Sequence, residues 1–238
     1  MVKRGRNQER LKCIASNVKS GGIVADIGCD HAFTSIYLVE EKLARGAIAI
    51  DINKEPLKRA WQHIQESGME EYISVRLSNG ARGLKKGEAD TILISGMGGA
   101  LIASILEESI NIIKDAKELV LSPQSEIYIV RHFLHDNGFQ IVSEEMVKEQ
   151  GKFYVVIRAV PGSQHYKDES GYIYGEYLIE NKNKILEEFL LKEQKRTGSI
   201  LDSLASSSGS AAVKERKDTL LKEYNMIKGI LKKINLHL

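Results

Sequence analysis

One stretch near the amino end, residues 24–31, constrains the fold more than any other part of the chain. A short apolar run, Ile23 to Ile27, has the composition of a buried strand and stops at Gly28. After the glycine, apolar residues recur at helical spacing: Ile36, Leu38, Val39 and Leu43. Strand, glycine turn and helix in this order open many α/β sheets, which bind ligands at the carboxyl ends of their strands.

The glycine turn is flanked by two carboxylates, Asp26 and Asp30. Gly28 allows a ligand to approach the backbone because it has no Cβ. A phosphate would find free amides at the helix start, but the carboxylates would repel it. A nicotinamide dehydrogenase would need further glycines, where this chain has Asp30 and Phe33. The turn therefore favours a cationic ligand such as S-adenosylmethionine, which carries an ammonium and a sulfonium group.

The overall charge is nearly balanced, with 34 Lys and Arg against 32 Asp and Glu. The amino end is an exception, because up to Val24 its basic residues are opposed only by Glu9. Such an arm is either a solvated terminus or a surface that contacts phosphates. We take it as RNA-binding, through Arg4, Arg6 and Arg10.

The two cysteines, Cys13 and Cys29, suit neither a disulfide framework nor a metal cluster. The longest uncharged run, Thr91 to Leu106, contains three glycines and falls short of the ~20 residues that a membrane span needs. No apolar segment follows the basic start, as a signal peptide would require. We therefore expect a soluble cytoplasmic protein without a metal or a membrane partner.

A rhythm of strands and helices continues along the chain. The expected strands are 23–27, 47–50, 73–77, 91–94, 119–121, 139–146 and 153–160. Expected helices are 11–18, one after the Gly28 turn, one after Asp51, 100–106 and 130–134. The helix after Asp51 has Leu57, Ala60, Trp61 and Ile64 on one face, which we expect to be buried. Alternation predicts a parallel sheet, and the last two strands form a hairpin around Gly151. The fold class is therefore α/β, a Rossmann-like sheet of seven strands with the last one antiparallel.

Two further turns follow strands of this sheet. Asp51 ends the second strand about 20 residues after the first turn, where a carboxylate can accept both ribose hydroxyls of a nucleoside. Ile52 follows it. Asn79 and Gly80 follow the third strand, where an adenine would lie. The alternatives are a helix cap for Asp51 and an ordinary turn for Asn79-Gly80.

Several motifs resemble those of the TrmK-type tRNA (adenine-N1)-methyltransferases. Residues 24–32, V-A-D-I-G-C-D-H-A, are similar to the family motif V-A-D-I-G-[ST]-D-H-A-Y. Residues 94–102, I-S-G-M-G-G-A-L-I, are similar to a second family motif, I-x-G-M-G-G-x-L-I. The run 151–154 fits its G-K-x-Y hairpin, and D-I-N-K-E-P-L at 51–57 also matches. Cys29, Phe33 and the segment Leu121 to Gln124 depart from the family pattern.

The resemblance implies a class I methyltransferase with strand order 3-2-1-4-5-7-6. It implies transfer of a methyl group from S-adenosylmethionine to N1 of adenosine 22 in tRNA. The cofactor-binding residues would be Asp26, Gly28, Cys29, Asp30, His31, Asp51, Ile52, Asn79, Gly80 and Gly96. The catalytic residues would be Asp30, His31, Gly96 and Met97. His31 could instead cap or pack the helix that follows it.

The residues fit this chemistry. Methylation of an exocyclic amine normally uses an [ND]-P-P-[YF] loop, but the corresponding loop here is Ser95 to Gly98. Cytosine C5 methylation needs a Pro-Cys nucleophile, where this chain has Pro123-Gln124. Neutral adenine N1 already exposes a lone pair, so positioning and a negative group near the developing charge suffice. Asp30 and the Ser95 to Gly98 loop are placed for these roles.

The last third changes to charged helix from Ile173. Residues that recur at alternating intervals of four and three predict a heptad seam, the contact stripe of a coiled coil. One seam comprises Val213, Lys217, Leu220, Tyr224, Ile227, Leu231 and Ile234. A second, less regular seam comprises Ile179, Asn183, Leu186, Leu190, Glu193, Thr197, Ile200 and Leu204. A flexible turn at 206–210 joins them. We expect an antiparallel coiled-coil hairpin.

This hairpin suggests two domains, 1–161 and 170–238. The hairpin either docks or associates weakly with another copy, or contacts RNA; the resemblance implies tRNA contact, through Lys192, Lys195 and Arg196. Two other functions stay open: a methyltransferase-like protein that binds RNA or a partner without catalysis, and a small-molecule methyltransferase.

Overall fold

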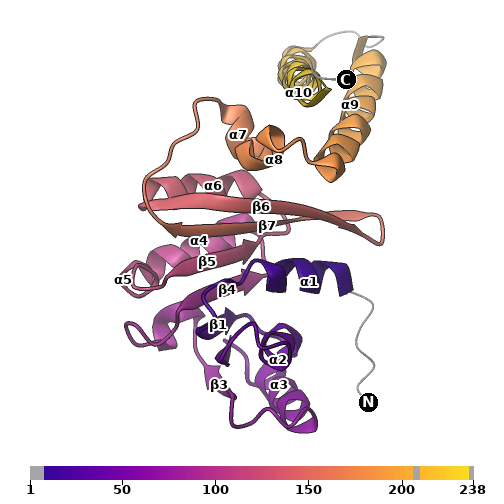
Figure 1. Ribbon diagram of the computed structural model, residues 1–238. Helices are drawn as coiled ribbons and strands as arrows, with labels where there is room; N and C mark the ends of the chain where they lie inside the picture. Colours follow the sequence, from indigo (N-terminus) through magenta and orange to yellow (C-terminus); the bar gives the residue numbers. More distant parts are fainter. Residues whose placement is uncertain (1–7, 206–209, 236–238) are drawn as a thin grey trace. The chain divides into compact units, whose positions relative to one another are not determined.

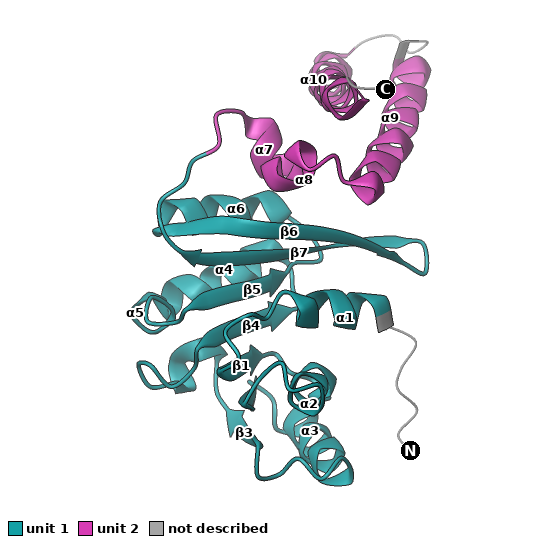
Figure 2. Cartoon of the chain, in the orientation of Figure 1, with its two compact units in different colours: residues 1–165 teal, residues 166–238 magenta. Residues whose placement is uncertain are grey.

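The computed structural model describes residues 8–205 and 210–235. It divides into two compact units, Met1–His165 and Tyr166–Leu238 (Figure 2). The expected RNA contacts Arg4 and Arg6, and most of the expected turn at 206–210, lie outside the described residues. The first unit holds the sheet and the second is helical (Figure 1).

The sheet has seven strands in the order β3-β2-β1-β4-β5-β7-β6, as the family resemblance implied. The four pairings among β3, β2, β1, β4 and β5 are parallel, and β7 runs antiparallel to both β5 and β6. The strands are β1 (Ile23–Ile27), β2 (Gly46–Asp51), β3 (Ile73–Leu77), β4 (Thr91–Ser95), β5 (Glu118–Ser122), β6 (Phe139–Glu149) and β7 (Lys152–Pro161). The carboxyl ends of β1 to β5 therefore meet at one edge of the sheet.

Helices cover both faces of the sheet, which explains why its strands are almost continuously apolar. One face packs against α1 (Gln8–Ser16), α2 (Phe33–Glu40) and α3 (Lys54–Glu66), and its core includes Val24, Leu93 and Val120. Residues that alternate with these, such as Ala25 and Ile92, are equally buried and face the other way. The connections beyond β3 carry η1 (Gly80–Gly83), α4 (Gly99–Glu108), α5 (Ile110–Ile113) and α6 (Ile127–Asp136).

Two expectations in this unit were inexact. The first helix begins at Gln8 rather than at residue 11, because Glu149 of β6 accepts hydrogen bonds from the backbone N–H groups of Glu9 and Arg10. A carboxylate at a helix start stabilises the first turn. Trp61, expected on the buried face of α3, is 37% exposed, whereas Leu57 and Ile64 are buried.

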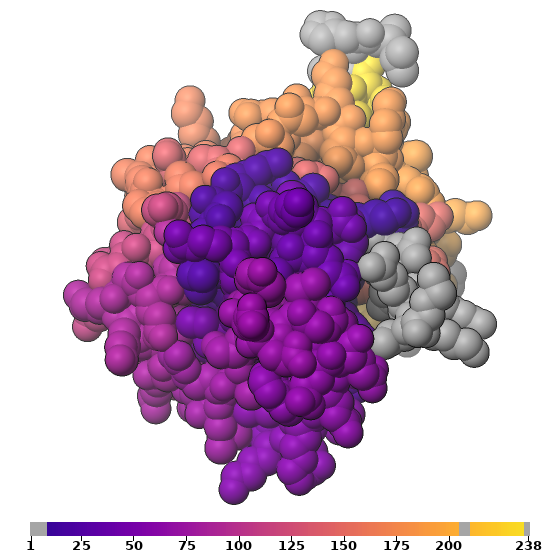
Figure 3. Space-filling model, turned by 60° about the horizontal axis from the view of Figure 1, so that its bottom comes forward, coloured from indigo at the N-terminus to yellow at the C-terminus, as the bar shows by residue number. Residues whose placement is uncertain are grey.

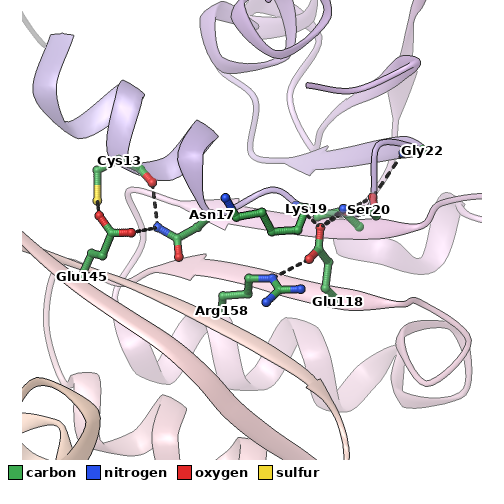
Figure 4. A network of polar contacts seen from close by, with 9 residues as sticks. Cys13, Asn17, Lys19, Ser20, Gly22, Glu118, Glu145 and Arg158 are labelled. Atoms are coloured by element: carbon green, nitrogen blue, oxygen red, sulfur yellow. Dashed lines mark hydrogen bonds and ion pairs between the residues drawn. The ribbon is translucent and has the colours of Figure 1, made fainter. Parts of the chain in front are cut away.

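Figure 4 shows how the first helix is fixed to the sheet. Asn17 donates to Glu145 of β6 at 3.1 Å, and the Cys13 thiol lies 3.6 Å from the same carboxylate. Past the helix, Glu118 of β5 accepts from the backbone N–H groups of Lys19 and Ser20 and pairs with Arg158 of β7. These bonds therefore fix α1 to β6 and the residues that follow it to β5.

The second unit contains α7 (Glu169–Tyr174), α8 (Glu176–Glu180), α9 (Lys184–Ala205) and α10 (Ala211–Asn235). The expected single helix from Ile173 was wrong, because the chain breaks at Gly175, whose φ is +90°, and again before α9. Asn183 is not a seam residue: its Oδ1 accepts from the backbone N–H groups of Ile185 and Leu186 and starts α9.

The two long helices form the expected hairpin. Thr197 of α9 bonds to Glu223 of α10 at 3.4 Å, and Gly198 faces the Tyr224 ring. The seam is buried at Leu186 and Leu190 on α9 and at Ile227, Leu231 and Ile234 on α10, and loosens toward the connection, where Lys217 is exposed. Among the described residues, no helix is long and apolar enough to cross a membrane.

Candidate active site

The turn after β1 has an unusual backbone. Gly28, Asp30 and Ala32 all have positive φ, at +73°, +48° and +57°. Left-handed conformations are costly for residues with a Cβ, and they gather at functional sites. The N–H groups of Gly28 and Cys29 both donate to the Ile50 carbonyl of β2, at 2.8 and 3.0 Å. These two amides are therefore engaged within the sheet and are not free donors.

Asp26 lies behind this turn and is 3% exposed. Its Oδ2 accepts a 2.7 Å hydrogen bond from Ser35 of α2. Burial raises the pKa of Asp26 to about 6, and the hydrogen bonds from Ser35 oppose the shift. Burial also raises the pKa of the Cys29 thiol, and the nearby carboxylates of Asp26 and Asp51 add to this effect. Cys29 is consequently a protonated, unreactive thiol in an acidic surrounding.

Asp30 points outward, with its side chain 63% exposed. Its carboxylate lies 3.4 Å from Arg59 of α3 and 3.5 Å from Nε2 of His31. Neither residue caps α2, because the cap position is Ala32 and no side chain bonds to that helix start. The capping alternative for this turn is therefore wrong, and Asp30 remains available to a ligand.

The His31 ring packs in a small aromatic group instead. It stacks on Phe33 with centroids 5.4 Å apart, and His63 of α3 lies 4.7 Å from Phe33. Nδ1 of His63 lies 3.1 Å from the His31 carbonyl. Nδ1 of His31 is buried, and no described residue hydrogen-bonds to it. Phe33 is 41% exposed, so the group offers an aromatic surface beside Asp30.

At the end of β2, Asp51 is 9% exposed. Its Oδ1 accepts from the backbone N–H of Asn53 at 2.8 Å, which fixes the carboxylate at the sheet edge. Ile52, the next residue, is 60% exposed, and Leu77 at the end of β3 is 50% exposed. A carboxylate flanked by exposed apolar side chains suits a nucleoside, whose ribose is polar and whose base is flat and apolar.

The third predicted turn is partly structural. Gly80 has φ of +61° and begins η1, and a Cβ there would press against Ile105 of α4 at 2.9 Å. Asn79 precedes it and is exposed at the same edge. Gly80 therefore allows η1 to pack on α4, while Asn79 is open to a ligand.

The loop after β4 joins the site from the other side. The Gly96 N–H donates to the Ser122 carbonyl at 3.1 Å, and the Gln124 N–H donates to the Met97 carbonyl at 2.8 Å. These bonds hold the loop against the end of β5. The Met97 side chain covers Gly28, because a Cβ on Gly28 would overlap its methyl group. Gly96 and Met97 thus adjoin the glycine turn of β1, as β1 and β4 are paired.

Taken together, the sheet edge gathers Gly28, Asp30, Asp51 and Gly96 from three separate stretches of sequence, the ends of β1, β2 and β4. Figure 3 brings forward the end of the molecule that carries α2, α3 and β3. Among the described residues, no group of three or more His, Cys, Asp or Glu side chains is placed to hold a metal ion.

Sequence reasoning missed several neighbours of the site. Arg59 and His63 come from the outer part of α3, and Tyr154 and Ser122 come from β7 and β5. Tyr154 had a signal, since it belongs to the G-K-x-Y stretch. Arg10, expected in an RNA-binding arm, lies instead over the Tyr154 ring, with its Cζ 4.8 Å from the ring centroid.

The RNA contacts expected on α9 differ in their surroundings. Arg196 forms ion pairs with Glu193 at 2.7 Å and with Glu223 of α10 at 3.5 Å. Lys192 and Lys195 are exposed. Arg196 therefore contributes to the hairpin itself.

Comparison with known proteins gives consistent matches. Residues 7–157 match the family described as "Methyltransferase domain". The chain is 32% identical to the tRNA (adenine(22)-N(1))-methyltransferase of Bacillus subtilis (strain 168), covering 94% of this chain and 96% of that protein.

Solved structures agree. The crystal structure of the B. subtilis m1A22 tRNA methyltransferase TrmK is 31% identical, with a TM-score of 0.84 over 94% of this chain and 97% of that one. Streptococcus pneumoniae Sp1610 in complex with S-adenosyl-L-methionine is 32% identical, with a TM-score of 0.83 over 93% of this chain and 98% of that one.

Proposed function

The chain belongs to the TrmK family of tRNA (adenine-N1)-methyltransferases, and we propose that it methylates N1 of adenosine 22 in tRNA with S-adenosylmethionine as the methyl donor. The observation that carries this function is the likeness to the B. subtilis enzyme over nearly the whole of both chains. The sequence resemblance is thereby confirmed, as is the choice of cofactor, which the related S. pneumoniae protein binds.

The residues at the sheet edge fit this cofactor. Asp51 is a fixed acceptor beside the exposed Ile52, as a ribose and its adenine require. The Met97 side chain lies against Gly28 at the turn, and the buried Nδ1 of His31 still needs a partner. The carboxylates of Asp26 and Asp30 attract the cationic end of the cofactor. When bound, the cofactor supplies a methyl group on a positively charged sulfur.

The chain's own contribution to the transfer is electrostatic and geometric. Adenine N1 attacks with its lone pair, so the site needs no general base. Asp30 lies at the exposed rim of the turn, where its charge would stabilise the cationic ring that forms. The adjacent Phe33 surface suits stacking of a base. The Ser95 to Gly98 loop, bonded to the end of β5, would hold the adenine in line.

The proposal also assigns roles to the helices of the second unit. Lys192 and Lys195 on α9 would contact tRNA phosphates, whereas Arg196 would act through the hairpin. A cytoplasmic location is part of the same proposal, and the tRNA substrate supports it. Weak self-association through α9 and α10 remains a prediction, because their seam is already used within one chain. Sedimentation at several concentrations tests it.

Methylation of unmodified tRNA transcripts by the full chain tests the function. Nucleoside analysis by liquid chromatography and mass spectrometry should find 1-methyladenosine, and a transcript with guanosine at position 22 should receive no methyl group. Tight tRNA binding without any methylation would favour the non-catalytic alternative. Transfer to small nucleosides but not to tRNA would favour a small-molecule enzyme.

A further inference from the structure

Polar atoms without partners gather at the carboxyl edge of the sheet. Among the described residues, Nε and Nη2 of Arg10 and Oγ of Ser122 are shielded from solvent and form no hydrogen bond. Buried polar atoms are nearly always paired, and a charged donor without a partner is especially unfavourable. An unpaired set of this kind calls for an acceptor that comes from outside the chain.

The position of Arg10 is fixed by the rest of its helix. The carboxylate nearest to it, Glu149, is occupied by the backbone N–H groups of Glu9 and Arg10 at 3.1 and 3.5 Å. Asn17 and Glu145 anchor the other end of α1 to β6 (Figure 4). The guanidinium packs on the Tyr154 ring, and none of the residues in the described ranges forms an ion pair with it.

The guanidinium lies directly over the catalytic loop. Its Nη2 and the Nε2 of Gln124 each lie 3.6 Å from the point where a Cβ on Gly96 would be. Nε and Nη2 are on the same edge of the guanidinium, so the two unpaired donors form one fork. Such a fork fits the two oxygens of a carboxylate or a phosphate.

Ser122 shares this location. Val24, Leu93 and Val120 belong to the core on the α1 face of the sheet. Side chains two residues further along a strand lie on the same face. Ser122 therefore lies on the α1 face at the end of β5, level with Ser95 of β4. Its fully buried hydroxyl can add a third donor beside the Arg10 fork.

We propose that Arg10, supported by Ser122, binds the carboxylate of the methionine part of S-adenosylmethionine. This inference rests on the proposed function, because it takes the cofactor as given. The fork is enclosed, which suits a small buried group better than an RNA phosphate that stays in water. It also completes the charge pattern: Asp26 and Asp30 attract the cationic groups of the cofactor, but would repel its carboxylate unless a cation lay opposite them.

Calorimetric titration with two ligands tests the proposal without any methyl transfer. S-adenosylhomocysteine keeps the carboxylate, and decarboxylated S-adenosylhomocysteine lacks only that group. The wild-type chain should prefer the first by about 10–100-fold, the range expected for hydrogen bonds to a charged group. Arg10→Gln should lose this preference to within about 3-fold while it binds the decarboxylated ligand as the wild type does.

Three further variants make the outcome specific. Arg10→Lys keeps the charge without the fork and should keep only part of the preference. Ser122→Ala should reduce it by about 2–10-fold, as for a single hydrogen bond. Lys12→Gln is the matched control, because Lys12 is an exposed cation on the same helix, and should change nothing.

Each other outcome contradicts the proposal. A preference that persists in Arg10→Gln removes Arg10 from the carboxylate site, and if tRNA binding weakens in that variant, the fork binds RNA phosphate. Equal weakening of both ligands makes Arg10 structural. If the wild-type chain binds neither ligand, the proposed function itself fails, which is a separate result.

Discussion

Ser35 donates a 2.7 Å hydrogen bond to Oδ2 of Asp26, and no described cation forms an ion pair with that buried carboxylate. The bond joins the first strand to the helix after the glycine turn. The ionised form of this buried carboxylate is poorly solvated, and its charge therefore lowers the stability of the folded chain.

The first prediction is therefore a pH dependence. The pKa of Asp26 is raised from 3.8 to about 6 in the folded chain. The folded state keeps a proton that the unfolded state has lost, so stability should fall as the pH rises from about 4 to about 6. The fall amounts to at most about 3 kcal/mol, at about 1.4 kcal/mol per pKa unit. Denaturant unfolding of the ligand-free chain at several pH values measures it.

Asp26→Asn should remove this component of the pH profile and be more stable than the wild type at neutral pH. Glu71→Gln, which changes an exposed carboxylate of the same unit, should keep the wild-type profile. Equal slopes for wild type and Asp26→Asn would show that Asp26 titrates normally.

The second prediction concerns Asp51. Asp51→Asn retains an oxygen for the Asn53 N–H but removes the charge that a ribose would meet. Affinity for S-adenosylhomocysteine should fall by about 1–3 kcal/mol, the usual loss for a hydrogen bond to a charged group. Calorimetry measures it, with the exposed Glu55→Gln on the following helix as the control. An unchanged dissociation constant would remove Asp51 from the site.

The third prediction separates chemistry from binding at Asp30. Asn tolerates the left-handed backbone at this position, where φ is +48°, so Asp30→Asn changes mainly the charge. Single-turnover methylation at saturating cofactor should slow by about 10–1000-fold, as for loss of one electrostatic stabiliser. Cofactor affinity should change much less. Arg59→Gln, which removes the cation beside Asp30, is the companion variant and should not slow the reaction. A near-wild-type rate for Asp30→Asn would assign it no catalytic role.

The fourth prediction concerns the second unit. A chain ending at His165, the boundary of the first unit, should bind S-adenosylhomocysteine as the full chain does. Its affinity for tRNA should fall, because Lys192 and Lys195 are lost with α9. In the full chain, Lys192→Gln with Lys195→Gln should weaken tRNA binding and reduce its salt dependence. Normal tRNA binding by both proteins would assign the hairpin to another partner.

The sequence determined most of the fold. Apolar runs such as Ile23–Ile27 are local signals, and glycine and aspartate at their ends mark the turns, so strand positions follow from neighbouring residues alone. The same is true of Asp51 and Gly28, which are placed by the ends of their own strands. The long helices were less well predicted where Gly175 and Asn183 interrupt them, because a helical periodicity continues across a break of a few residues.

Only the tertiary structure decided what surrounds those residues. Arg10 reads as part of a basic arm, yet Glu149, distant in sequence, starts its helix, and Tyr154 supports its guanidinium over Gly96. The sequence suggests that Asp26 attracts a cationic ligand, but its pKa depends on the structure, because burial raises it and the hydrogen bonds from Ser35 oppose the rise. Burial and the pairing of polar atoms depend on which strands and helices meet, and the meeting residues are separated by long stretches of chain.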